Sequence, residues 1–211
     1  MASIEESVRT VGAAWKESPY YETAERWTHI FWDHSTPFRR LFDRLDLAAT
    51  LELACGHGRH SEQIAARCGR LVLMDIHSEN IEFCRSRLSH FANTEYYVNN
   101  GFNFHPLADQ SLTSLFCYDA MVHFSPDIVR SYLLDTARIL KPNGQALFHH
   151  SNYPAPENVS YGKNPHARNH MTQPLFCSFA REAHLAVVES IVIPWSNEPN
   201  LDCITLVQKA P

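Results

Sequence analysis

Residues 51–60, LELACGHGRH, carry the clearest chemical signal in the chain: an apolar run that contains Glu52 and then breaks at Gly56 and Gly58. Alternating glycines let a ligand approach the main chain, and the helix that follows such a turn offers free N–H groups to it. Asp75 ends the next apolar run, RLVLMDI, where a carboxylate can accept hydrogen bonds from both hydroxyls of a ribose. The pattern predicts a ligand that contains adenosine.

Two cofactor classes fit this pattern. A dinucleotide fingerprint needs a third glycine, and this chain has Ser61 instead. Glu52 suits a cofactor that bears an ammonium or a sulfonium, and it does not suit a diphosphate. These residues favour a sulfonium cofactor and leave a nicotinamide-dependent oxidoreductase open.

Residues 48–150 resemble class I (Rossmann-like) S-adenosylmethionine-dependent methyltransferases. The last two predicted strands, which should pair with each other, also agree with the edge hairpin of that family. The first motif of that family resembles the segment around Glu52, with Ala54 where the family often has glycine. The resemblance implies the following cofactor contacts: Glu52, Ala54, Gly56 and Gly58 in the first motif, Asp75 and Ile76 at the ribose, Asn100, Gly101 and Phe102 at the adenine, and Tyr118 and Asp119 beside the methionine part. S-adenosylmethionine is therefore the expected cofactor, and S-adenosylhomocysteine the expected product.

Histidines supply the candidate bases, since the nucleophile that attacks a sulfonium methyl can need a proton acceptor. His123 follows the fourth predicted strand, and its structural alternative is a partly buried cap of the turn. His149 and His150 end the fifth strand, so one faces the pocket and the other lies beneath a helix. We expect His123 and His150 to be catalytic and His149 to contact substrate.

Two further segments are expected near the substrate. The excursion 152–172 contains Arg168 and His170, which can close over an acceptor or belong to a solvated loop. The aromatic N-terminal segment resembles a lid, from which Tyr20 or Tyr21 is expected to touch cofactor or substrate, although ordinary helix packing explains some of its aromatic residues.

Strands and helices alternate after residue 48, which predicts a doubly wound α/β fold with a seven-stranded, mostly parallel sheet. Only about nine residues separate the last two strands, so these should form an antiparallel hairpin at the C-terminal edge. We expect strands at 49–55, 70–76, 94–100, 111–119, 145–151, 186–194 and 203–209, and helices at 59–67, 78–90, 126–140 and 174–183. Ser18-Pro19, Thr36-Pro37 and Ser78 are expected helix starts, and 142–144 a turn.

The whole chain, 1–211, is expected to form one domain: a helical N-terminal lid (1–45), a cofactor-binding core (46–151), and a substrate loop with the C-terminal hairpin (152–211). The net charge of −5 argues against nucleic acid, and the absence of a signal sequence or a long apolar run predicts a cytoplasmic protein without membrane contact. The six cysteines include no C-x-x-C pair, and the 13 histidines no H-E-x-x-H spacing, so no metal is expected.

These features predict O-methylation of a small molecule such as a sugar, a phenol or a natural-product intermediate. The reason is that histidine bases suit a hydroxyl, and nothing resembles the Asn-Pro-Pro-Tyr/Phe motif of amide and nucleobase N-methylation. N-methylation of a small amine remains an alternative, and so does a cofactor-binding module without catalysis.

Overall fold

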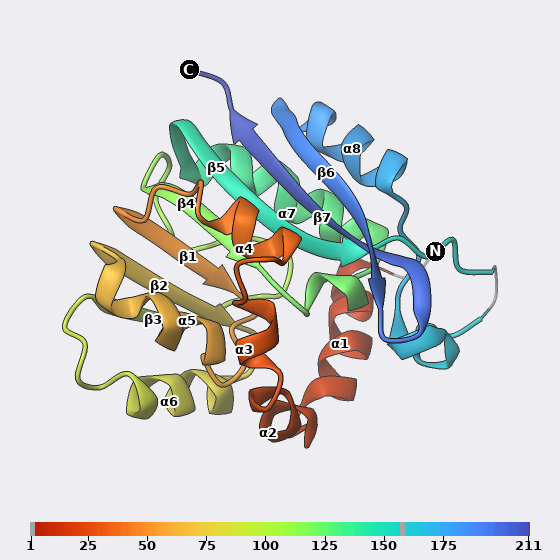
Figure 1. The fold of residues 1–211 in the computed structure, drawn as a ribbon, viewed down its shortest axis with the longest axis horizontal. Coiled ribbons are helices and arrows are strands. Elements are labelled where there is room, and N and C mark those ends of the chain that lie inside the picture. Colours follow the sequence, from red (N-terminus) through yellow and green to blue (C-terminus); the bar gives the residue numbers. More distant parts are fainter. Residues whose placement is uncertain (1–2, 157–158) are drawn as a thin grey trace.

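The computed structural model describes residues 3–156 and 159–211, and it has a seven-stranded sheet at its centre (Figure 1). The strand order is β3-β2-β1-β4-β5-β7-β6. The strands are β1 (Ala49–Leu53), β2 (Arg70–Asp75), β3 (Thr94–Val98), β4 (Leu112–Cys117), β5 (Leu140–Ser151), β6 (Leu185–Trp195) and β7 (Glu198–Lys209). The first five pair in parallel, whereas β7 runs antiparallel to both β5 and β6. The predicted doubly wound sheet with an antiparallel edge hairpin is confirmed.

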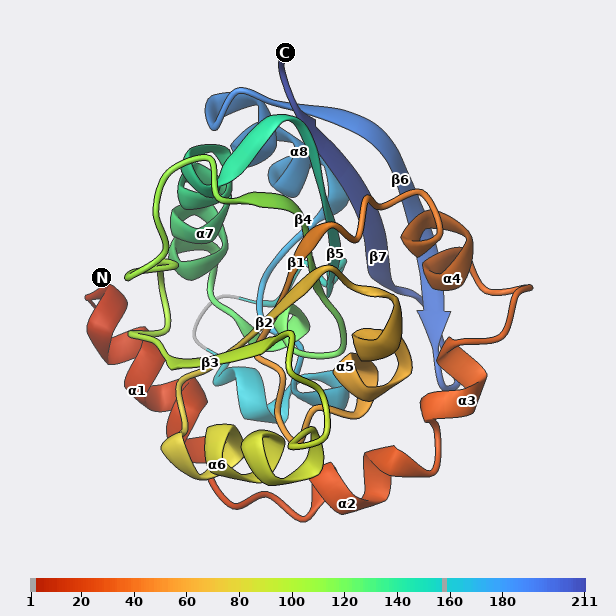
Figure 2. The same cartoon turned by 90° about the vertical axis from the view of Figure 1, so that its left-hand side faces the viewer.

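Helices cover both faces of the sheet because buried strand residues alternate between two apolar layers. In β2, Val72 and Met74 join the cluster that includes α7 (Pro126–Ile139) and α8 (Gln173–Glu182). Leu71 and Leu73 join the opposite cluster, which includes α4, α5 and α6. Figure 2 shows α7 and α5 on opposite sides of the sheet. The covering helices on the second face are α4 (Pro37–Phe42), α5 (Arg59–Ile64) and α6 (Ser78–Arg87).

The N-terminal segment has two parts: its last helix packs against a face of the sheet, and its first helices lie beyond the carboxyl ends of the strands. Thr36 caps α4, with Pro37 in the first turn, as its sequence predicts. The aromatic side chains of α4 are buried against the sheet. By contrast, α1 (Ile4–Trp15) and α2 (Tyr20–Glu25) lie beyond the ends of β1 and β2 (Figure 2), and α3 (Thr28–Phe31) leads back to α4. Helix α2 begins with Pro19 in the capping position, so Ser18 lies one residue outside it.

Several boundaries differ from the sequence expectations, among them those of α5, α6 and β5. Helix α5 ends at Ile64 and tightens into a 3₁₀ turn over Ala65–Arg67. Ser78 is the first residue of α6 and not its cap, which is His77. Strand β5 begins at Leu140, so the expected turn at 142–144 is an interruption in the β4–β5 register, which resumes at Gln145.

The hairpin is also tighter than the nine-residue gap suggested, because β6 and β7 both extend into that gap and leave only residues 196–197 between them. No helix among residues 3–156 and 159–211 is long and apolar enough to cross a membrane.

Candidate active site

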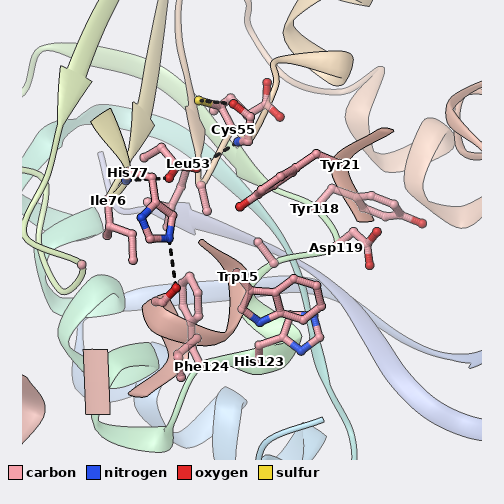
Figure 3. A pocket seen from close by; sticks show the side chains of 18 of the residues that line it. Trp15, Tyr21, Leu53, Cys55, Ile76, His77, Tyr118, Asp119, His123 and Phe124 are labelled. Atoms are coloured by element: carbon pink, nitrogen blue, oxygen red, sulfur yellow. Dashed lines mark hydrogen bonds between the residues drawn. The ribbon is translucent and has the colours of Figure 1, made fainter. Parts of the chain in front are cut away.

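A cavity opens at the carboxyl ends of β1, β2 and β4, beneath α1 and α2 (Figure 3). It encloses about 960 Å³, solvent at its mouth included. Strand order reverses between β1 and β4, and ligands of doubly wound sheets bind at that point.

The glycine turn after β1 forms one wall of this cavity. Gly56 has φ +51°, and a Cβ atom there would lie 2.8 Å from Cε1 of Tyr21. Ala54 also has a positive φ, of 53°, and lines the cavity. Gly58, with φ +73°, caps α5 and packs against Cys84, behind the lining. The turn therefore lets the Tyr21 ring lie directly on the main chain.

Asp75, at the end of β2, is a buried carboxylate at the same edge. Its Oδ2 accepts a hydrogen bond from the Gly56 N–H (2.9 Å). Its Oδ1 accepts from the His77 N–H (2.9 Å) and from Nδ2 of Asn80 (3.1 Å). Burial raises the pKa of Asp75, against these donors. A carboxylate offers about four acceptor positions, so these three donors leave room for another on Oδ2.

Glu52 and Ile76 also line the cavity. Glu52 is 2% exposed, and its Oε2 accepts a hydrogen bond from the Ser61 hydroxyl at 2.5 Å. Burial raises the pKa of Glu52 to about 7. The hydroxyl in place of a third glycine thus satisfies the buried acid of the turn.

Asp119, just past β4, makes several hydrogen bonds at the end of the cavity away from Asp75. Its Oδ2 accepts hydrogen bonds from the Tyr20 hydroxyl (2.5 Å) and from the Arg59 guanidinium (2.8 Å). Burial, followed by the Asp119 charge, raises the pKa of Tyr20. Asp119 has φ +58°, and its N–H donates to Nδ1 of His149 (3.1 Å). Within the described chain, Oδ1 of Asp119 makes no hydrogen bond.

His123 lines the cavity and lies against the Trp15 ring, with centroids 4.3 Å apart (Figure 3). Its Nδ1 is 2.9 Å from the Ala167 carbonyl oxygen, which can only accept. Nδ1 therefore carries the proton, and Nε2 is left as an acceptor. Burial lowers the pKa of His123 to about 4, so the ring is neutral at pH 7.

Four histidine and arginine candidates do not line the cavity. His149 lies behind Asp119 and hydrogen-bonds Asp202. His150 faces the opposite layer, stacked on Phe176 of α8 at 3.8 Å. The alternation of a strand thus separates the two neighbours as expected, but neither reaches the cavity. Arg168 and His170 of the excursion also lie outside its lining.

Arg168 is 2% exposed and forms a two-pronged ion pair with Asp202, at 2.9 and 2.5 Å. Asp202 of β7 also accepts a hydrogen bond from His149. The ion pair with Asp202 therefore anchors Arg168, and with it the excursion, to β7.

At the end of β3 the structure brings Asn99 and Gly101 to the cavity, whereas Asn100 and Phe102 lie outside the lining. The Asn100 side chain instead accepts from the N–H groups of Phe102 and Asn103 in a local turn. β3 ends two residues earlier than expected, at Val98. One residue of register decides which asparagine faces the site.

Arg59 and His60 also line the cavity, although the sequence argument gave them no role. Their position directly after the glycine turn was the available signal. The cavity is also lined by Trp15, from the aromatic N-terminal segment, and by His77. His77 contacts α1, where its Nε2 lies 3.1 Å from the Gly12 carbonyl oxygen (Figure 3).

Carboxylates predominate among the charged side chains of the lining. Glu25, Glu52, Asp75 and Asp119 are its carboxylates, and Arg59 is its one lysine or arginine side chain among the described residues. A diphosphate would meet like charge here. A cofactor with a sulfonium and an ammonium matches the site, because opposite charges attract most strongly where water is excluded.

Comparison with known proteins agrees with this geometry. Residues 50–144 match the model of a methyltransferase domain family. A search of curated proteins finds no significant match. Among solved structures, the Haloferax volcanii putative methyltransferase, in complex with the Trm112 methyltransferase activator, is 17% identical (TM-score 0.70) and covers 94% of this chain and 97% of its own.

Two other structures are similar. Geranyl diphosphate C-methyltransferase from Streptomyces coelicolor, solved with S-adenosyl-L-homocysteine, is 13% identical (TM-score 0.68) and covers 82% of this chain and 74% of its own. The [4+2]-cyclase SpnF is 9% identical (TM-score 0.66) and covers 90% and 82%. At such identities the structures show a shared fold. With the family match over residues 50–144, that fold confirms the predicted resemblance to class I S-adenosylmethionine-dependent methyltransferases and argues against the nicotinamide alternative.

Proposed function

We propose that the chain methylates a hydroxyl oxygen of a small molecule inside the cavity between Asp75 and His123. The observation that carries the proposal is the acceptor nitrogen of His123, fixed by Ala167 at the β4 end of an otherwise acidic, enclosed site. S-adenosylmethionine supplies a sulfonium-bound methyl group that is already activated for nucleophilic attack.

The residues at the strand ends would hold this cofactor. Asp75 would accept the ribose hydroxyls through the remaining acceptor position on Oδ2, while Tyr21 lies over the glycine turn. Oδ1 of Asp119 makes no hydrogen bond with a described residue and would accept the ammonium group. Glu52, whose Oε2 accepts a hydrogen bond from Ser61, would attract the positively charged cofactor from beneath the glycine turn.

His123 would orient the methyl acceptor, because its Nε2 can only accept a hydrogen bond and so selects a substrate group that donates one. A hydroxyl that donates to this nitrogen presents its lone pairs to the methyl group, and such positioning lowers the barrier to the transfer. As the oxygen gains the methyl group, its proton would move to Nε2. The low pKa of His123 limits it to acidic hydroxyls such as phenols.

N-methylation of a small amine is the second candidate, because the acidic lining would attract a protonated amine. Such an amine must lose its proton before it can attack a sulfonium carbon, and His123 is a weak base for that step. The fold does not choose between acceptors, since its solved examples include a C-methyltransferase and a cyclase. The exclusion of nucleic acid rests on the charge of the chain alone and stays a prediction.

Thermal unfolding with S-adenosylhomocysteine, and separately with NAD, tests the cofactor site. A ligand at 100 times its dissociation constant stabilises by about 2.7 kcal/mol, which raises the midpoint by roughly 5–10 °C for a chain of this length. Asp75→Asn should remove most of the shift, whereas Asp109→Asn, on the surface, should retain it.

Transfer of a labelled methyl group to phenol and to aniline then compares oxygen with nitrogen on the same ring. Methylation of phenol that is lost in His123→Phe supports the proposal. Methylation of aniline alone contradicts it.

A further inference from the structure

His60, in the first turn of α5, carries a buried polar atom without a partner. The Trp32 indole N–H, which can only donate, lies 3.1 Å from Nδ1 of His60. Nδ1 therefore has no proton, and Nε2 must carry it. Nε2 is buried and has no hydrogen-bond partner among the described residues. Buried donors are almost always paired in folded proteins, so this one calls for a partner.

Tyr118, at the end of β4, is the second polar group in the same part of the cavity. It is 7% exposed, and its hydroxyl hydrogen-bonds no described residue. The rings of His60 and Tyr118 meet edge to face, with centroids 5.4 Å apart. Such an edge contact is a weak substitute for a hydrogen bond to the N–H group. The two residues come from different elements and both line the cavity.

The surroundings of this pair are apolar and aromatic. The rings of Phe31 and Phe38 lie within 6.3 Å of the His60 ring, and within 5.0 Å of the Tyr118 ring, between centroids. Tyr118 follows β4, which lies on the other side of β1 from β2 and Asp75. A ligand on this side would sit beyond the cofactor, where the methyl acceptor belongs.

The nearby charges select an uncharged ligand. Arg59 is paired with Asp119, and Arg168 with Asp202, so neither of these arginines is left to neutralise an anion. Burial, followed by the Arg59 charge, keeps the pKa of His60 well below its ordinary value, and the ring donates as a neutral group. An unpaired charge in such surroundings is costly, whereas a neutral oxygen is not.

We propose that His60 and Tyr118 form the acceptor subsite, in which Nε2–H of His60 donates to an oxygen of a neutral, ring-bearing substrate such as a phenol. The inference rests on the proposed function and names its substrate class. His60 is a substrate-binding residue here, and Trp32 is the positioning residue that fixes its tautomer.

Phenol, toluene and benzoate serve as probes on the protein saturated with S-adenosylhomocysteine. The three share one ring and differ in a neutral oxygen, no oxygen, and a charged carboxylate. We expect phenol to shift the side-chain Nε2–H resonance of His60 in ¹H–¹⁵N spectra, and toluene and benzoate to leave it in place. A resonance that phenol does not move overturns the proposal, since the Tyr118 ring is then a sufficient partner.

Three variants separate binding from packing. His60→Phe should weaken phenol binding by about fivefold to tenfold, the effect of one lost hydrogen bond. His60→Gln, which keeps a donor, should recover part of that loss. Trp32→Phe removes the indole donor that fixes the tautomer. Nε2 then carries the proton for only part of the time, so phenol binding should weaken, by less than in His60→Phe.

S-adenosylhomocysteine affinity, measured on every variant, should stay within about twofold and reports folding as well. If His60→Phe does not fold, the affinities of His60→Gln for phenol and for toluene decide, because the retained donor acts on phenol alone. Equal loss of phenol and toluene binding in His60→Phe overturns the proposal, because the role of His60 is then one of packing. A wild-type protein that does not bind S-adenosylhomocysteine contradicts the proposed function instead.

Discussion

The ion pair between Arg168 and Asp202 yields the sharpest stability prediction. Both side chains are buried, at 2% and 0% exposed, and two hydrogen bonds join them. Arg168→Met retains much of the apolar stem and removes the charge. It leaves the Asp202 carboxylate buried with His149 as its one remaining side-chain donor among the described residues.

The expected loss is about 3–5 kcal/mol, the usual effect of leaving a buried charge without its partner. For a chain of this length that lowers the melting temperature by roughly 6–20 °C. Burial alone would raise the pKa of Asp202, but His149 and Arg168 outweigh it and lower the pKa to about 2. The carboxylate therefore stabilises the fold fully above pH 4, and this stabilisation is lost as the pH falls through 2.

Urea and thermal unfolding at pH 7 measure the effect. Arg130→Met is the matched control, because Arg130 pairs with Glu182 on the surface, and exposed pairs contribute about 1 kcal/mol or less. Adding Asp202→Asn to Arg168→Met should recover part of the loss, since the uncompensated charge is then gone. If Arg168→Met costs no more than Arg130→Met, the assignment of Arg168 to anchoring is refuted.

Two further predictions concern the turn and the buried histidines. Gly56 has φ +51°, and the Cβ of Gly56→Ala would lie 2.8 Å from the Tyr21 ring, so this variant should weaken S-adenosylhomocysteine binding about tenfold or more in calorimetry. Gly162→Ala, whose Cβ would lie in open space, should change the affinity little, and equal affinities of the two variants would contradict the close contact. Burial lowers the pKa of His123 to about 4 and that of His150 to about 3, so the unfolded chain binds more protons below pH 6.5. The free energy of unfolding should therefore fall between pH 6.5 and 4, and less steeply in His150→Phe; urea titrations with no slope there would exclude this linkage.

The sequence was sufficient to predict the sheet and its first ligand-binding turn. Continuous apolar runs separated by helical segments specify parallel strands that are covered on both faces, and Gly56 and Asp75 follow directly from the ends of two such runs. The short gap before the last strand was sufficient to predict an antiparallel edge. These features depend on neighbours in the chain, so a single sequence contains them.

The contacts of the site were decided by tertiary packing. His150 and Arg168 have the right chemistry for catalysis and binding, but their side chains are engaged by Phe176 and Asp202, from elements distant in sequence. His60 shows the converse, because only its bond to Trp32 fixes the proton on Nε2 and leaves a donor unpaired at the cavity. Residue type and spacing determine which groups reach the sheet edge, whereas long-range hydrogen bonds determine which of them remain free to meet a ligand.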